Sequence, residues 1–192
     1  MDPQQPAPRR DHLVAVATAL FCRDGFHATG IDRVLAESGV AKMTLYKHFP
    51  SKDDLIGACL EGVAATSRAA VEQVLARAGR SARAKVLALV RSFAMTCAAP
   101  GFSGCAFHHA CAEFADRHHP AHRAATEHKR WLRGVLLGLC KEHGQRRPER
   151  AADQLLLVIE GALALGPLDT ARDLVDATLR LATQVLDGAR SE

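Results

Sequence analysis

Prolines and glycines divide this chain into segments whose lengths suit helices. Proline cannot continue a helix, and it also restricts the residue before it, so helices tend to end where prolines stand. The breaks between segments fall at Pro50, Pro100, Pro120, Pro148, Pro167, Gly25, Gly30, Gly39, Gly79 and Gly101. The spacing of these prolines and glycines predicts a succession of helices joined by short turns.

The residues inside the segments favour the same structure. Alanine contributes 35 and leucine 23 of the 192 residues, whereas valine, isoleucine and threonine together contribute 25. Alanine and leucine have high helix propensity, while β-branched residues favour strands. The sequence therefore predicts an all-α fold of about nine helices. Their expected ranges are 11–24, 31–38, 42–48, 52–78, 82–98, 103–116, 121–143, 148–165 and 168–188.

Composition excludes several classes of protein. With 48% hydrophobic and 24% charged residues, the chain has the makeup of a globular protein and not of a disordered one. Its unbroken apolar runs are shorter than the roughly 20 residues that a membrane span needs, so no transmembrane helix is expected. Residues 1–10 are expected to form a disordered tail without a secretion signal. We therefore expect a cytoplasmic protein whose six cysteines are reduced thiols.

Residues 26–49 have the pattern of a helix-turn-helix. Two short helical segments are separated by Ser38 and Gly39, and the second helix of this motif enters the DNA major groove. The apolar residues of both segments are expected to face Leu20 and Phe21 of the preceding helix; they are Ile31, Val34, Leu35, Val40, Leu45 and Phe49. This arrangement leaves Lys42, Thr44, Lys47 and His48 on an exposed polar face.

The stretches Thr29 to Val40 and Thr44 to Leu55 resemble the N-terminal part of TetR-type transcriptional regulators. The resemblance extends from Leu13 to about Leu60. It implies a DNA-binding domain over residues 11–51 and an effector-binding and dimerisation domain over residues 52–188. It further implies a homodimer that binds a double-stranded palindromic operator and a small-molecule effector, with no catalytic residues, cofactor, metal or membrane partner.

The resemblance also implies roles for individual residues. Thr29 and Lys52 match positions that commonly contact DNA phosphates. Lys42, Met43 and Thr44 match the start of the recognition helix, where base edges are read. Tyr46, Lys47 and His48 match a segment that contacts the DNA backbone. These side chains suit the roles, since phosphate contacts commonly come from lysine, tyrosine and threonine.

Two residues depart from the family pattern. Ala41 stands where a serine often caps the recognition helix, so a cap that contributes about 1 kcal/mol is missing or supplied elsewhere. Met43 replaces a frequent glycine and places an apolar group where it can contact a thymine methyl group. Residues 1–60 contain seven basic and seven acidic residues, so DNA binding depends on where the charges lie and not on their sum.

The stretch from Gly101 to Phe114 is the most distinctive part of the remaining chain. It resembles a subgroup of these regulators that has a Gly-Cys start and a Glu-Phe end around the sixth helix. On a helix, Cys105, His108, His109 and Ala112 would share one face. The residues expected to line a pocket for a mainly apolar effector are Phe93, Phe102, Cys105, Phe107, His108, His109, Ala112 and Trp131. The aromatic residues among them could equally be plain core.

Other functions are weaker alternatives. Cys105 and His109, with His118, His119 or His122, could form a metal- or redox-responsive site, although no Cys-x-x-Cys pair is present. The phosphate-binding loops and nucleophile turns of common enzymes are absent, so catalysis is not expected. A protein that coats DNA without sequence preference would need more than the formal charge of +4.

The resemblance implies that the last two helices pair with their copies in a second subunit. Each carries an apolar stripe at helical spacing. The residues expected at the dimer interface are Leu155, Leu156, Ile159, Leu163, Leu174, Thr178, Leu181 and Val185. The alternative is that these stripes belong to the core of the chain itself.

Overall fold

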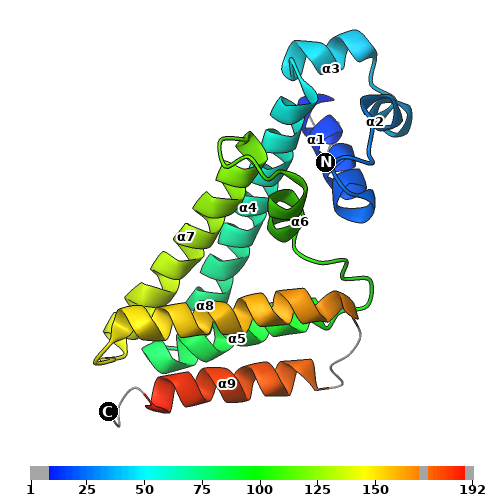
Figure 1. Ribbon diagram of the computed structural model, residues 1–192. Helices are drawn as coiled ribbons and strands as arrows, with labels where there is room; N and C mark the ends of the chain where they lie inside the picture. The colour runs from blue at the N-terminus through cyan, green and yellow to red at the C-terminus, as the bar shows by residue number, and fades with distance from the viewer. Residues whose placement is uncertain (1–8, 169–172, 189–192) are drawn as a thin grey trace, which may run out of the picture. The chain divides into compact units, whose positions relative to one another are not determined.

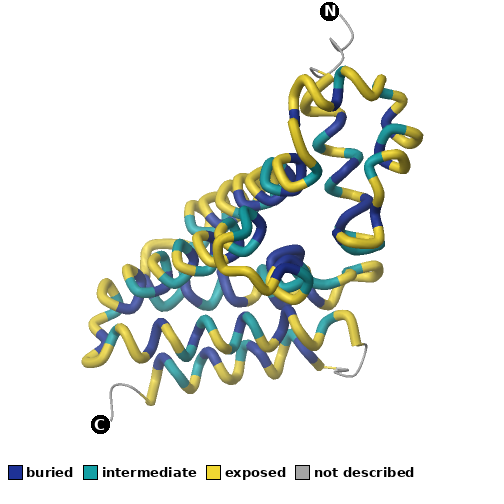
Figure 2. Tube along the Cα trace, turned by 45° about the horizontal axis from the view of Figure 1, so that its top comes forward, coloured by how far each residue is buried: buried dark blue, intermediate teal, exposed yellow. Residues whose placement is uncertain are grey.

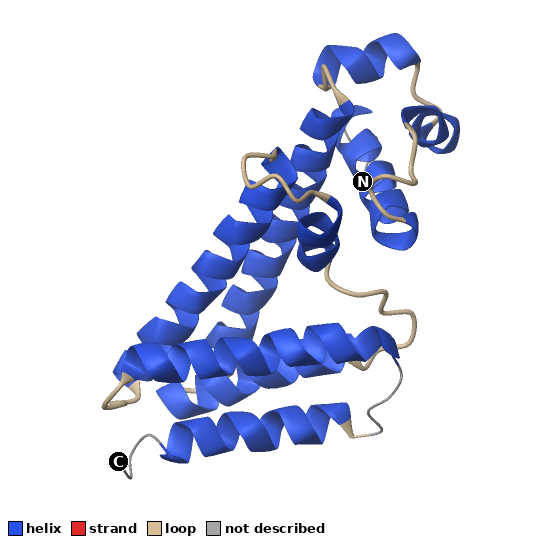
Figure 3. Ribbon diagram, viewed as in Figure 1, coloured by secondary structure: helices blue, strands red, loops and turns tan. Residues whose placement is uncertain are grey.

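A computed structural model describes residues 9–168 and 173–188. Within these ranges the chain forms nine α-helices and one short 3-10 helix, with no strand (Figure 3), which confirms the all-α class. The helices are α1 (Arg9–Asp24), α2 (Ile31–Ser38), α3 (Lys42–His48), α4 (Lys52–Arg77), α5 (Ala82–Cys97), α6 (Ala106–Glu113), α7 (Pro120–Glu142), α8 (Pro148–Leu165), η1 (Gly166–Leu168) and α9 (Leu174–Gly188).

The predicted ranges of α2, α3 and α8 match the structure, and those of α6 and α9 differ most. α6 begins three residues late because Gly101 and Gly104 adopt positive φ angles of 81° and 109°, which a helix does not allow. α9 begins at Leu174 and not at residue 168, and residues 169–172 lie outside the described part of the chain. Most of the predicted N-terminal tail also lies outside it, while Arg9 and Arg10 are helical.

The chain forms two compact units. The first unit contains residues 1–65 and 106–126, and the second contains residues 66–105 and 127–192. Helices α4 and α7 each contribute to both units. The segment 106–126, which includes α6, thus clusters with the helix-turn-helix although some 60 residues separate the two along the sequence.

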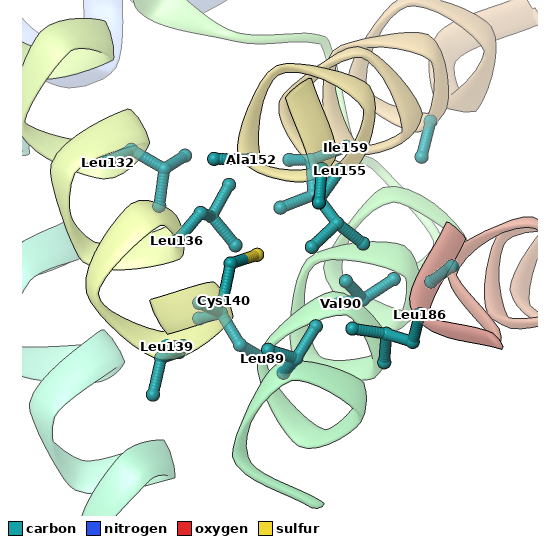
Figure 4. Packing of buried hydrophobic residues seen from close by; sticks show 14 of the residues in the cluster. Leu89, Val90, Leu132, Leu136, Leu139, Cys140, Ala152, Leu155, Ile159 and Leu186 are labelled. Carbon is teal, nitrogen blue, oxygen red and sulfur yellow. The ribbon is translucent and has the colours of Figure 1, made fainter. Parts of the chain in front are cut away.

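The second unit has a continuous apolar core. Its helices α5, α8 and α9 lie side by side (Figure 1). Leu132, Leu136 and Cys140 of α7 point toward Leu155 and Ile159 of α8 (Figure 4). Leu89 and Val90 from α5, with Leu186 from α9, complete the part of the core shown there.

This core contains most residues that were expected at the dimer interface. Leu155, Ile159, Leu163, Leu174 and Thr178 are buried within the single chain, which favours the alternative that these stripes belong to the core of the chain itself. Leu156 and Val185 are half-buried, and Leu181 is exposed. Because α8 is apolar around most of its circumference, helical spacing alone does not separate its inner stripe from its outer one.

A second apolar stripe faces outward from α8 and α9. Buried and exposed positions alternate along both helices (Figure 2). We call the outward set the outer stripe; its members are Leu157, Gly161, Ala164, Leu165, Leu168, Ala177 and Leu181. Because of this second apolar face, Pro148–Leu168 is long and apolar enough to cross a membrane by length and composition, although one third of its apolar window is buried in the protein.

Three of the six cysteines lie inside the protein. Cys59, Cys97 and Cys140 are buried, and burial raises the pKa of each to about 11 because it penalises the charged thiolate. These three side chains behave as small apolar groups at neutral pH.

Candidate functional site

The helix-turn-helix is formed by α2, a three-residue turn and α3. Gly39 ends α2 in the left-handed conformation, with φ of 66°, and its N–H donates to the Leu35 carbonyl. Ala41 precedes α3 and makes no side-chain cap hydrogen bond, which is the first of the two possibilities that the sequence left open. The Ala41 carbonyl instead accepts from the N–H groups of both Thr44 and Leu45, at 2.9 and 3.1 Å.

Apolar residues beneath these helices fix their orientation. Val34, Leu45 and Phe49 are buried, together with Leu20 and Phe21 of α1, as the pattern predicted. Ile31, Leu35 and Val40 are half-buried at the edge of this core. A ring nitrogen of His12 on α1 lies 3.1 Å from the Ser38 carbonyl and ties α1 to the end of α2.

The burial of Leu45 leaves the polar side chains of α3 facing outward. Lys42, Lys47 and His48 are exposed, and Thr44 is half-buried. Met43 is 82% exposed and Tyr46 is 40% exposed. The outward face of α3 therefore combines an apolar side chain, a phenol and two lysines.

Acidic residues of α1 and α2 form ion pairs around the helix-turn-helix. Arg33 contacts Asp24 at 3.2 Å and Glu37 at 3.3 Å, while Arg23 contacts the same two acids. The hydrogen bonds from Arg23 lower the pKa of Asp24, which therefore stays ionised and bound to its arginines. Asp32 of α2 pairs with Lys42 of α3 at 3.8 Å, so one of the two lysines of α3 shares its charge with a neighbouring carboxylate.

Lys52 and Thr29, the two residues expected to contact phosphates, differ in their exposure to solvent. Lys52, the first residue of α4, is half-exposed and its ammonium group lies 3.5 Å from the His27 carbonyl. Ser51 and Asp54 form a reciprocal cap at the same helix start, with Asp54 N–H donating to the Ser51 hydroxyl at 3.1 Å. Thr29 has no exposed surface, which argues against a direct contact between its hydroxyl and a phosphate.

The loop between α1 and α2 is held by the end of α6, a contact that the sequence analysis missed. Glu113 accepts hydrogen bonds from the backbone N–H groups of Phe26, at 2.9 Å, and His27, at 2.6 Å. The ring of Phe114 packs 5.8 Å from that of Phe26 and stacks at 4.0 Å on His119. The Glu-Phe pair was visible as a motif, but nothing in its local pattern indicated a partner 87 residues away.

Four of the predicted effector residues gather in the second unit. Phe93, Phe102, Cys105 and Trp131 are half-buried and pack against the apolar core. The guanidinium group of Arg68 lies 5.5 Å from the centre of the Trp131 ring.

An ion pair lies beside this cluster. Lys129 contacts Glu160 at 2.8 Å, and its ammonium group is 3.7 Å from the Cys105 sulfur. Burial, reinforced by the charges of Lys129 and Arg68, lowers the pKa of His128 to about 4. His128 is therefore neutral at pH 7, so the fixed charges of this region come from Lys129, Glu160 and Arg68.

The other four predicted effector residues belong to the first unit. Phe107 is buried, His108 and His109 are half-buried, and Ala112 is exposed. Cys105 precedes the first helical residue, Ala106, so the predicted helical face that joins it to His109 does not form as such. That all eight residues line one pocket remains a prediction.

A groove of about 490 Å³ lies elsewhere in the second unit. It is lined by residues of α8, α9 and the preceding turn, namely Arg146, Arg147, Arg150, Ala151, Gln154, Gln184, Val185 and Gly188. None of the predicted effector residues lines it. Across the described part of the chain, no group of three histidine, cysteine or acidic residues could hold a metal ion.

The helix-turn-helix matches a known family of regulators. Residues 13–59 match the family described as bacterial regulatory proteins, tetR family. An HTH-type transcriptional activator, FasR of Mycolicibacterium smegmatis, is 35% identical over 85 residues, which are 44% of this chain and 38% of that protein. The HTH-type transcriptional repressor KstR2 of the same organism is 37% identical over 54 residues, 28% of this chain and 26% of that protein. The matched regions thus span well under half of these relatives.

Solved structures match over nearly the whole chain. A TetR-family transcriptional regulator from Streptomyces coelicolor is 35% identical, with a TM-score of 0.89 and coverage of 94% of this chain and 95% of that one. A TetR-type regulator from Streptomyces avermitilis is 32% identical, with a TM-score of 0.83 and coverage of 96% and 99%. The members of this family are DNA-binding proteins and not enzymes. The chain is therefore a TetR-family transcriptional regulator with an N-terminal helix-turn-helix.

Proposed function

We propose that the protein is a homodimeric repressor in the bacterial cytoplasm, which binds a palindromic operator through α3 and is released by a small organic effector. The observation that carries DNA recognition is the outward face of α3, where Lys42, Met43, Tyr46 and Lys47 are exposed above buried Leu45. Such a face combines groups for phosphates with groups for base edges.

Two variants separate sequence reading from phosphate binding. Thr44→Ala should change which bases are preferred, whereas Lys47→Ala should weaken binding to all DNA sequences alike. Lys47 is a better phosphate variant than Lys52, because Lys52 also contacts the His27 carbonyl within the protein. In a dimer Lys47→Ala removes two phosphate contacts, so the slope of log K against log salt concentration should fall by about 2.

The test begins with binding-site selection from random duplexes, followed by affinity measurements at two salt concentrations. Recovery of a palindrome supports the proposal. Binding that is indifferent to sequence in wild type, or equal loss on every duplex for both variants, would contradict operator recognition. Deletion of the gene should raise transcription beside the recovered sites, and a fall would mean activation.

The dimer interface that we now propose is the outer stripe, in place of the inner residues first expected. Leu157 is 70% exposed, Leu168 60% and Leu181 51%, so a large apolar surface faces water in the single chain. Exposed apolar patches of this kind mark protein contacts. A dimer also suits the function, because a palindrome presents two half-sites about one helical turn of roughly 34–36 Å apart.

The effector that we propose is mainly apolar with one or two polar groups, and its site includes the half-buried side chains of Phe93, Phe102, Cys105 and Trp131. Apolar surfaces with a few polar groups are typical of small-molecule sites. Lys129, Glu160 and Arg68 supply polar contacts next to the aromatic residues. An effector that binds better to the released conformation shifts the protein away from DNA.

Trp131 provides a direct assay, since the chain has one tryptophan. Candidate compounds are titrated while Trp131 fluorescence and operator release are followed together. A true effector changes both with the same midpoint. Compounds that release DNA without altering Trp131 fluorescence would place the effector site elsewhere, for example in the arginine-lined groove.

A thiol-based response is the second candidate, favoured by the distance of 3.7 Å between the Lys129 ammonium group and the Cys105 sulfur. Reactive cysteines lie in partly exposed surroundings beside cationic groups, and Cys105 is half-buried next to this ammonium group. Alkylation with iodoacetamide should then release the operator from wild type but not from Cys105→Ser. The exposed Cys111 gives the matched control, because Cys111→Ser should remain sensitive.

A further inference from the structure

The loop between α1 and α2 is an irregular segment on which the position of α2 depends. α1 ends at Asp24, and Gly25 follows with φ of 91° and an N–H donated to the Phe21 carbonyl. The chain then turns through Phe26 and His27 before α2 begins at Ile31. Loop N–H groups that lie near the protein interior need acceptors, and here no regular secondary structure supplies them.

Glu113 supplies those acceptors. One carboxylate oxygen accepts from Phe26 N–H and the other from His27 N–H, so both oxygens bind the loop. The backbone carbonyl of Glu113 also lies 2.9 Å from a ring nitrogen of His27. Hydrogen bonds to an ionised carboxylate are stronger than those between neutral groups, and a pair of them fixes orientation as well as distance.

The surroundings of this contact leave little freedom. A side chain at Gly25 would place its first carbon 3.2 Å from a Glu113 carboxylate oxygen, so the absence of a side chain allows the close approach. Phe26 is buried against Phe21, with ring centres 5.3 Å apart. The ring of Phe114 packs on the ring of His27, the next residue of the loop, with ring centres 4.8 Å apart. The apolar packing and the two hydrogen bonds therefore act at the same point of the loop.

We propose that Glu113 is a positioning residue for operator binding, which acts from α6 by holding the α1–α2 loop and thereby setting the position of α2. The inference rests on the proposed operator function. It makes the DNA-binding part of the protein discontinuous: residues 106–126 belong to it together with the N-terminal helices. Glu113 need not contact DNA, because its effect passes through the loop to α2 and α3.

Amide hydrogen exchange tests the contact without DNA. In Glu113→Ala, the amides of Phe26 and His27 should both exchange at least about tenfold faster than in wild type, because both acceptors are lost. In Glu113→Gln at least one of the two amides should exchange faster, because a glutamine side chain has one acceptor oxygen where two are needed. Glu61→Ala, which alters an exposed acid on α4 in the same unit, is the control and should leave both amides unchanged. Unchanged exchange in Glu113→Ala would overturn the proposed contact.

Operator affinity then tests the positioning role. Glu113→Ala should bind the operator about tenfold more weakly while keeping wild-type affinity for non-specific DNA, and Glu61→Ala should match wild type on both. A merely structural role would lower both affinities together, in step with the folded fraction. Gly25→Ala should weaken operator binding more in wild type than in Glu113→Ala, since the clash with the carboxylate is gone in the latter.

These measurements distinguish failure of the operator function from failure of the positioning role of Glu113. If wild type prefers no DNA sequence, the operator function fails whatever Glu113 does. If wild type binds an operator and Glu113→Ala binds it equally well, the operator function stands and the positioning role is refuted.

Discussion

Truncation of the outer stripe should weaken the dimer in proportion to the apolar surface that the stripe exposes. Leu157 is 70% exposed in the single chain, and complete burial of a leucine side chain contributes roughly 1.5–3 kcal/mol. Burial of the exposed part therefore contributes about 1–2 kcal/mol. A two-fold interface contains the residue twice, so Leu157→Ala should cost on the order of 2–4 kcal/mol, which is roughly a 30- to 700-fold increase in the dimer dissociation constant.

Sedimentation velocity over a dilution series measures that constant directly. Met95→Ala is the matched control, because Met95 on α5 is 58% exposed and lies outside α8 and α9. We expect a dissociation constant close to wild type for Met95→Ala and a large increase for Leu157→Ala. Equal constants for the two variants would refute the reasoning, and would mean that subunits pair through another surface or not at all.

Three further predictions concern stability. Leu155→Ala, at a core position first assigned to the interface, should lower the free energy of unfolding by about 2–5 kcal/mol in urea titration, and no change would contradict its burial. Burial lowers the pKa of His128 to about 4, so the unfolded chain binds a proton at this residue between pH 6.5 and 4 while the folded protein does not. The free energy of unfolding should therefore fall as the pH falls from 6.5 toward 4, and His128→Gln should make this fall smaller. Gly39→Ala should cost about 1–2 kcal/mol in the same titration because φ is 66°, and Gly39→Asn less, whereas equal values would show that the turn relaxes.

Local signals in the sequence were sufficient for much of the fold. Ser38 and Gly39 fall between two short periodic segments, and Pro148 begins a helix at its first position, so α2, α3 and α8 could be predicted with their bounds. The inward residues Val34 and Leu45 followed from the same periodicity. These predictions succeeded because each depends on residues within one or two turns of the chain.

Predictions that required knowledge of distant neighbours failed or stayed untested. Residues 155–159 are all apolar, so periodicity alone could not decide which face of α8 lies inside. Buried Leu155 and exposed Leu157 differ only through their position relative to α5 and α9. The contact of Glu113 with the loop has the same origin, because a glutamate at the end of a helix is ordinarily a solvated side chain.

The recognition helix itself illustrates why distant contacts matter for DNA reading. A helix of seven residues without a side-chain cap would not persist alone in water. α3 keeps its form because Leu45 and Phe49 are buried beneath it, so its position follows that of α1 and α2. The geometry that Lys42, Thr44 and Lys47 present to a groove is therefore a property of the whole first unit. A contact at the α1–α2 loop can alter it without touching α3, and this is the physical basis on which a residue of α6 can govern operator affinity.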